Sequence, residues 1–282
     1  MRIALCNEVL SDRPFAAQCA LARELGYDGL EVAPFTLAGH PDLIDDATTA
    51  TILRTARDEG IVITGLHWLL VHPEALSITS TDAAIRTRTV TVMRRLIELC
   101  AALGGSYLVH GSPAQRRVPP GDTAQDAWSR ARDCFAQAGV LAQRSGVRYL
   151  IEPLPRDETD LINTLDEAAA MLRDAGGTGL GLVLDAKSVA LSEGVTVEAA
   201  AARWLPTGLL GHVQLNDRNR RGPGQGDDRF AGLLATLQSH GYGGDIAIEP
   251  FDYHPDRATQ AARAIGYVRG ILEGLASRQE QR

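Results

Sequence analysis

Short apolar runs alternate with longer amphipathic segments along the whole chain. The runs are rich in leucine, isoleucine and valine and end at polar residues or glycines, which is the pattern of strands buried in a parallel sheet. The expected strands are Ile3–Cys6, Gly29–Val32, Val62–His67, Tyr107–His110, Arg148–Glu152, Gly181–Asp185, His212–Leu215 and Asp245–Glu249.

The amphipathic segments between these runs predict helices. Residues that cap helix N-termini precede several segments, such as Asp122 with Thr123, and glycines such as Gly26 and Gly146 follow the ends of others. The expected helices are Phe15–Leu25, Thr49–Glu59, Thr81–Leu103, Thr123–Gln143, Thr164–Ala175, Val197–Trp204, Arg229–His240 and Ala258–Leu275.

Eight strand–helix pairs with no linker between them predict an α/β fold, a single-domain (β/α)₈ TIM barrel over residues 1–276. The polar residues 277–282 are expected to form a disordered tail. An open doubly wound sheet is the alternative architecture. The even number of strands and the lack of a G-x-G-x-x-G motif after the first strand count against it.

Composition narrows the function classes. The net charge of −7 argues against a nucleic-acid partner, because phosphate binding needs a concentrated Lys and Arg surface. No apolar run approaches the ~20 residues that a membrane span requires, and the N-terminal run is too short for a signal peptide. The four cysteines form no C-x-x-C pair, which is typical of reduced thiols in a cytoplasmic protein.

Polar residues stand at the C-terminal ends of the predicted strands, where barrel enzymes place their active sites. Glu152, Asp185 and Glu249 close strands five, six and eight, and three neighbouring carboxylates repel one another unless a cation or protons intervene. A divalent metal would relieve the repulsion, with His212 or Gln214 of strand seven as the fourth ligand. The alternative is a set of solvated carboxylates paired with nearby arginines.

Three segments carry a resemblance to a known family. They are G-H-V-Q-L-N-D-R-N-R-R-G-P-G-Q-G at 211–226, I-E-P-L-P-R-D-E-T at 151–159 and I-E-P-F at 248–251. Their order and spacing resemble the xylose-isomerase-like TIM-barrel superfamily of sugar phosphate isomerases and epimerases. The branch that the chain resembles most contains the ketose 3-epimerases and hydroxypyruvate isomerase.

The resemblance implies one divalent metal held by Glu152, Asp185, Gln214 and Glu249. The epimerases usually have His at the position of Gln214, whereas hydroxypyruvate isomerase is similar to this chain in having Gln. An all-oxygen ligand set favours Mn²⁺ or Mg²⁺, with Co²⁺ as a further candidate.

The resemblance also implies substrate contacts at Glu158 and Arg220. Ser188 occupies the position where the epimerases have a substrate-contacting His, which sets this chain apart from the tagatose and psicose enzymes. His67, Trp68 and His110 are expected at the mouth by their positions at strand ends, and we count them with Ser188 as candidate substrate contacts. The alternative for Trp68 is a structural place at the barrel rim, and that for His110 is a hydrogen-bonded structural role.

Other charged residues receive different predictions. Lys187 is expected to be solvated, and Glu8 and Glu31 are expected to lie away from the metal. Glu152 and Glu249 are the expected acid and base, because removal of a C–H proton beside a carbonyl needs a positioned carboxylate.

The predicted function is therefore a metal-dependent isomerase or epimerase that converts a sugar, keto-sugar or related hydroxy-carbonyl compound through an enediolate. A lyase or dehydratase that uses the same site is the main alternative. A hydrolase resembling endonuclease IV lacks the histidines that it would need at Gln214 and Ser188, and a non-catalytic barrel does not explain the three carboxylates. The resemblance further implies a homo-oligomer, a dimer or a tetramer.

Overall fold

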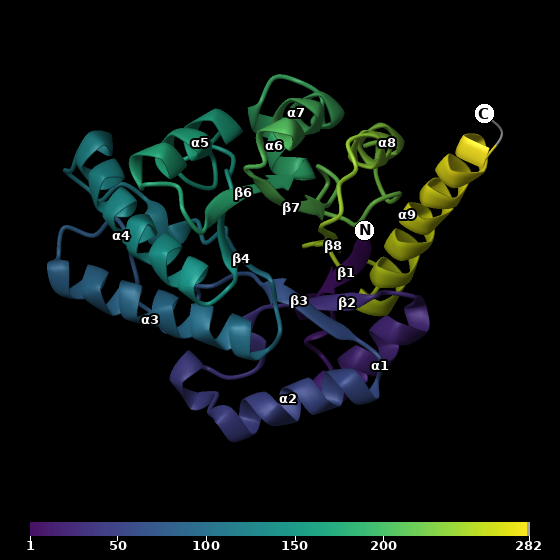
Figure 1. The fold of residues 1–282 in the computed structure, drawn as a ribbon, viewed down its shortest axis with the longest axis horizontal. Coiled ribbons are helices and arrows are strands. Elements are labelled where there is room, and N and C mark those ends of the chain that lie inside the picture. Colours follow the sequence, from purple (N-terminus) through teal and green to yellow (C-terminus); the bar gives the residue numbers. More distant parts are fainter. Residues whose placement is uncertain (281–282) are drawn as a thin grey trace.

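Eight parallel strands close into a barrel in the computed structural model, which describes residues 1–280 (Figure 1). Neighbouring strands pair in sequence order, and β8 pairs with β1 to close the ring. This confirms the predicted (β/α)₈ TIM barrel. The strands are β1 (Arg2–Cys6), β2 (Gly29–Val32), β3 (Val62–Leu66), β4 (Tyr107–His110), β5 (Arg148–Ile151), β6 (Leu180–Asp185), β7 (Leu210–Leu215) and β8 (Asp245–Ile248).

Helices surround the barrel as an outer layer (Figure 1). The α-helices are α1 (Phe15–Leu25), α2 (Asp46–Asp58), α3 (Ala83–Ala102), α4 (Ala124–Arg144), α5 (Leu165–Asp174), α6 (Ala186–Ser192), α7 (Val197–Trp204), α8 (Ala231–Ser239) and α9 (Arg257–Glu280).

Two of these helices differ from the prediction. The short helix α6 is not among the expected helices. It begins directly after β6, because the side chain of Asp185 caps it by accepting the N–H of Ser188. Helix α9 continues past Leu275 to Glu280, so residues 277–280 of the expected tail are helical. The rest of that tail, 281–282, lies outside the described residues.

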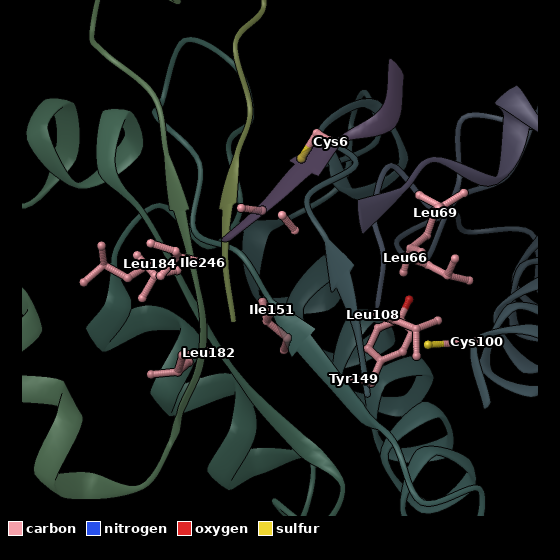
Figure 2. Packing of buried hydrophobic residues seen from close by; sticks show 14 of the residues in the cluster. Cys6, Leu66, Leu69, Cys100, Leu108, Tyr149, Ile151, Leu182, Leu184 and Ile246 are labelled. Atoms are coloured by element: carbon pink, nitrogen blue, oxygen red, sulfur yellow. The ribbon is translucent and has the colours of Figure 1, made fainter. Parts of the chain in front are cut away.

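The outer faces of the strands pack against the helices (Figure 2). Leu66, Leu108, Tyr149 and Leu184 are buried there, and Cys100 of α3 lies beside Leu108 and Tyr149. Each such side chain contributes about 1.5–3 kcal/mol by leaving water. These contacts make the barrel a rigid frame for residues at the strand ends.

The inner faces form a separate cluster of Tyr107, Val109, Leu150 and Val183. Gly65 of β3 makes room for the Tyr107 ring, because a Cβ there would collide with that ring and its backbone oxygen. Every second residue of a strand faces the same side, so the next inward positions toward the carboxyl ends are His67, Gly111, Glu152 and Asp185.

Candidate active site

Glu152, Asp185 and Glu249 meet at the carboxyl end of the barrel. Each is buried, and ligand atoms of the three lie within 4.8 Å of one another. Gly111 permits this arrangement, because a Cβ at that position would collide with the Glu152 carboxylate. The expected convergence of the three carboxylates is therefore present in the tertiary structure.

The three carboxyl groups have altered acidity. Burial, followed by repulsion from Asp185 and Glu249, raises the pKa of Glu152 well above its usual value. Burial also raises the pKa of Asp185 and raises that of Glu249 to about 7. Three ionised carboxylates are costly in this enclosure. The cluster is thus a site that can hold a cation, a proton or both.

Strand β7 offers the two candidates for a fourth ligand at different depths. Gln214 pairs in register with Asp185, whereas His212 pairs with Val183 deeper in the barrel. The His212 imidazole stacks on the Tyr107 ring, and its Nε2 lies 2.7 Å from Glu31 Oε2. Gln214 Nε2 donates to Glu31 Oε1 at 2.8 Å, and Gln214 Oε1 is buried without a hydrogen-bond partner in the described part of the chain. Gln214 Oε1 therefore fits the role of an oxygen ligand.

Glu8 lies beside the carboxylate cluster, which makes the expectation that it is remote from it wrong. It belongs to the 3₁₀ helix η1 (Asn7–Leu10) and is buried. Atoms of Cys6, Glu8, His67 and Glu249 lie within 4.8 Å of one another, and this second group is also able to hold a metal ion. Strand β1 ends at Cys6, so Glu8 lies past its carboxyl end, at the same end of the barrel as the carboxylate cluster.

Glu31 is likewise close to the site and fully buried. Its Oε1 lies 3.8 Å from His67 Nδ1. Burial opposes its ionisation, but the interactions with His212, His67 and Tyr107 lower the pKa of Glu31 to about 2. These interactions favour the ionised form of Glu31.

His67 and Trp68 contact Glu249 directly. His67 Nδ1 lies 3.1 Å from Glu249 Oε1, and the indole N–H of Trp68 donates to the same oxygen at 3.1 Å. His67 Nε2 lies 3.0 Å from Glu8 Oε2. Burial disfavours the imidazolium, but the surrounding carboxylates, Glu8 first, raise the pKa of His67 well above its usual value. Trp68 adopts φ 51°, which is an uncommon backbone conformation for a bulky residue. Residues held in such conformations cluster at functional sites.

A cavity of about 370 Å³ opens above these groups. Its volume suits a small ligand. Trp68 and Phe251 provide apolar walls, and Lys187, Glu158 and Arg220 provide charges. The lining residues are His67, Trp68, Val109, Gly111, Pro113, Glu152, Leu154, Asp157, Glu158, Lys187, Leu191, Arg218, Arg220, Glu249 and Phe251.

Lys187 is not solvated, contrary to the prediction. Its relative exposure is 6%, its Nζ lies 2.7 Å from Glu158 Oε1, and it sits 5.1 Å from the centre of the Phe251 ring. Helix α6 turns this side chain into the cavity directly after Asp185. Arg220 also lines the cavity. Its backbone adopts φ 70°, and its guanidinium carbon lies 5.8 Å from the centre of the Phe251 ring.

Two candidate substrate contacts do not line this cavity in the described structure. Val109 and Gly111 face inward on either side of His110, so the His110 imidazole points to the helix layer. There its Nδ1 lies 2.7 Å from the Tyr149 hydroxyl, and burial lowers its pKa to about 3. Ser188 is buried in α6, and its backbone N–H donates a hydrogen bond to Asp185 Oδ1.

Two supporting residues escaped the sequence reasoning. Arg116 is fully buried and donates to the backbone oxygen of Glu152 at 2.7 Å. Asn216 donates to Asp185 Oδ2 at 2.7 Å and accepts the N–H of Lys187 at 3.0 Å. Asn216 follows Gln214 by two residues on the same inward side, which was the available signal. Arg116 ends the short 3₁₀ helix η4 (Ala114–Arg116), and no local pattern marks it as a partner of Glu152.

The fold and the buried carboxylate centre define a TIM-barrel enzyme with its active site at the carboxyl end of the barrel. The model of the family described as xylose isomerase-like TIM barrel matches residues 19–271. The chain belongs to this family, which confirms the resemblance found in its motifs.

Individual relatives agree with this assignment. The D-psicose 3-epimerase of Agrobacterium fabrum is 29% identical over 236 residues, covering 81% of this chain and 76% of the relative. The L-ribulose 3-epimerase of Mesorhizobium japonicum is 27% identical over 239 residues, covering 82% and 74%. These relatives confirm the predicted class of isomerases and epimerases. A solved L-ribulose 3-epimerase superimposes with a TM-score of 0.84 at 22% identity over 99% of this chain and 97% of the other, which shows the shared fold.

Within the described residues, no helix is long and apolar enough to cross a membrane.

Proposed function

We propose that this protein is a divalent-metal-dependent epimerase or isomerase of a sugar, keto-sugar or related hydroxy-carbonyl compound. The observation that carries the proposal is the buried meeting of Glu152, Asp185 and Glu249. Gln214 pairs in register with Asp185, and its Oε1 has no hydrogen-bond partner among the described residues. The epimerase relatives support the sugar class of substrate.

The donor set suits a hard divalent cation. Glu152, Asp185, Glu249 and Gln214 would hold it, and four oxygen ligands favour Mn²⁺ or Mg²⁺, with Co²⁺ as a further candidate. Such a cation supplies polarisation of a substrate carbonyl. Asn216 holds Asp185 Oδ2, and the Ser188 N–H holds Asp185 Oδ1, so Asp185 is fixed before any cation arrives.

Glu249 is suited to remove a proton from the carbon beside the carbonyl. Its Oε1 is occupied by His67 and Trp68, which leaves Oε2 to face the reacting carbon. The C–H bond breaks, its electron pair forms the double bond of an enediolate, and the proton moves to the carboxylate.

Glu152 stands on β5, three strands from Glu249, and can return a proton from the other side of the carbon. Transfer from the opposite side inverts the centre, whereas return of the proton by the same carboxylate to the neighbouring carbon gives an aldose–ketose isomerisation. We propose Glu158, Lys187 and Arg220 as contacts for substrate hydroxyl or carbonyl oxygens, and Trp68 and Phe251 as the apolar surface for its carbon chain.

Metal content is the first test of this function. Purified protein is analysed for bound metals and melted with EDTA, and then with added Mn²⁺ or Mg²⁺. Near-stoichiometric metal, together with a melting temperature that falls with EDTA and recovers with Mn²⁺, is the expected result. Absence of binding would contradict the metal-dependent mechanism.

Activity is tested with a panel of D-psicose, D-fructose, D-tagatose, L-ribulose and hydroxypyruvate in D₂O. Deuterium incorporation beside the carbonyl, with formation of an epimer or isomer, is expected for at least one compound. Release of water and formation of an unsaturated or deoxy product would favour the lyase or dehydratase alternative. The Glu249→Gln variant is the matched control in both experiments.

The cytoplasmic location and the homodimer or homotetramer stay predictions. Light scattering of the purified chain measures the latter directly.

A further inference from the structure

Glu31 is a carboxylate surrounded by hydrogen-bond donors in the middle of the barrel. Its Oε2 accepts the Tyr107 hydroxyl at 2.6 Å and lies 2.7 Å from His212 Nε2. Its Oε1 accepts Gln214 Nε2 at 2.8 Å and Cys6 Sγ at 3.6 Å. Its exposure is 0%. Burying a charge costs free energy unless hydrogen bonds compensate for the lost water. The contacts of Glu31 provide that compensation.

The contact with Gln214 settles which way that amide points. An amide has a donating NH₂ end and an accepting oxygen end, whereas an ionised carboxylate only accepts. The NH₂ end must therefore face Glu31, and Oε1 must face away from it. Gln214 Oε1 is buried and has no partner in the described residues, while its strand neighbour in register is Asp185.

We propose that Glu31 is a positioning residue that fixes the Gln214 amide so that its oxygen is presented to a divalent cation held with Glu152, Asp185 and Glu249. This inference rests on the metal site of the proposed function. A reversed amide would direct its NH₂ group at the cation and could not ligate it. Outer partners that fix the orientation of a ligand in this manner tune metal affinity in other proteins.

The role is specific to a glutamine at position 214. A leucine there has neither a ligand atom nor an amide to orient, so only the charge of Glu31 can still act on the bound cation. Glu31 and Gln214 should therefore act as a unit. Their coupling is measurable as a double-mutant cycle, which separates a shared effect from two independent ones.

The experiment compares four metal-stripped proteins: wild type, Glu31→Gln, Gln214→Leu and the double variant. Free Mn²⁺ is followed by electron paramagnetic resonance during titration. We expect Glu31→Gln to weaken Mn²⁺ binding about 10- to 100-fold when residue 214 is Gln, since the new amide can pair with either end of Gln214. The same change should cost markedly less when residue 214 is Leu.

Loss of the Glu31 charge also weakens cation binding by itself, but that effect is the same in both backgrounds. Equal losses in the two backgrounds, or no loss with Gln214 present, would overturn the inference while leaving the metal site intact. A wild-type protein that binds no Mn²⁺ would overturn both the inference and the proposed metal dependence.

Two further variants guard against a folding defect. Glu31→Asp keeps the charge but shortens the side chain by one methylene, and it should weaken Mn²⁺ binding through lost reach. Tyr107→Phe removes a different donor to Glu31 and leaves the Gln214 contact, so its Mn²⁺ affinity should stay within about threefold of wild type. Circular dichroism and melting of the metal-free variants report folding. Wild-type affinity in a folded Glu31→Asp would also count against the inference.

Discussion

His67 and Glu249 form a hydrogen-bonded pair at the floor of the cavity, with His67 Nδ1 3.1 Å from Glu249 Oε1. The opposite ring nitrogen of His67 faces Glu8, and the Trp68 indole completes the contacts of Glu249 Oε1. Residues that follow β1 and β3 thereby hold the carboxylate that follows β8 in one orientation. Four predictions follow from this arrangement and from the cavity above it.

Replacement of Glu249 by Gln should preserve the fold and abolish turnover. Gln has nearly the same shape, but it cannot take a proton from carbon, and positioned acid–base groups contribute about 10²- to 10⁴-fold to rates. Deuterium exchange from D₂O into the substrate should be lost together with net conversion. Circular dichroism and the melting curve serve as folding controls. Full activity in Glu249→Gln would show that another group transfers the proton.

Replacement of His67 by Leu should lower kcat about 10- to 100-fold, the usual effect of losing a group that orients a ligand or base. The Glu249 carboxylate would lose one of its two donors and rotate more freely, while KM should change less. Trp68→Phe, which removes only the indole N–H to the same oxygen, is the matched comparison. Steady-state kinetics over pH 5.5–9 decides the matter, and an unchanged kcat for both variants would be inconsistent with this positioning role.

The metal-free protein should lose stability as pH rises from 5.5 to 8. The pKa of Glu249 is raised from 4.5 to about 7, so in that window the native state keeps a proton that the unfolded state has released. The free energy of unfolding then falls with increasing pH, by about 2 kcal/mol from this group.

His67 acts in the same direction. Its pKa is raised in the native state, so its stabilising contribution is present below the unfolded value of 6.5 and is lost as pH rises through the native pKa. Differential scanning calorimetry in EDTA at several pH values measures the trend, and Glu249→Gln should flatten it. Saturating Mn²⁺ should reduce the slope, because a cation stabilises the ionised carboxylates. A melting temperature that rises with pH in EDTA would refute the assignment.

Lys187→Met should raise KM about 10- to 100-fold with a smaller effect on kcat. The substitution retains much of the apolar stem against Phe251 but removes the ammonium that contacts Glu158 at the cavity. Ser188→Ala is the neighbouring control: its side chain does not line the cavity in the described structure, so KM should change less than about threefold. Equal effects of the two substitutions would remove Lys187 from the set of substrate contacts.

The barrel and the carboxylate centre could be predicted because both follow from short-range patterns. Parallel strands all have their carboxyl ends at the same rim of the barrel. Because Glu152, Asp185 and Glu249 each stand at such an end, they share that rim. The inward and outward parity along one strand was harder. The terminal position of His110 in its strand predicted a place at the mouth, yet Val109 and Gly111 are the residues of this segment that face the cavity.

Residue patterns along the chain were enough to predict the fold class, the edge of the barrel that carries the chemistry and the acidic residues gathered there, because periodicity and strand direction are local properties. The contact of Glu8 with His67, the burial of Lys187 and the contact of Glu31 with Gln214 became visible in the folded protein alone. These contacts join residues far apart in the chain. They depend on the stagger between strands and on which side chains face one another across the closed ring, and no local pattern encodes either.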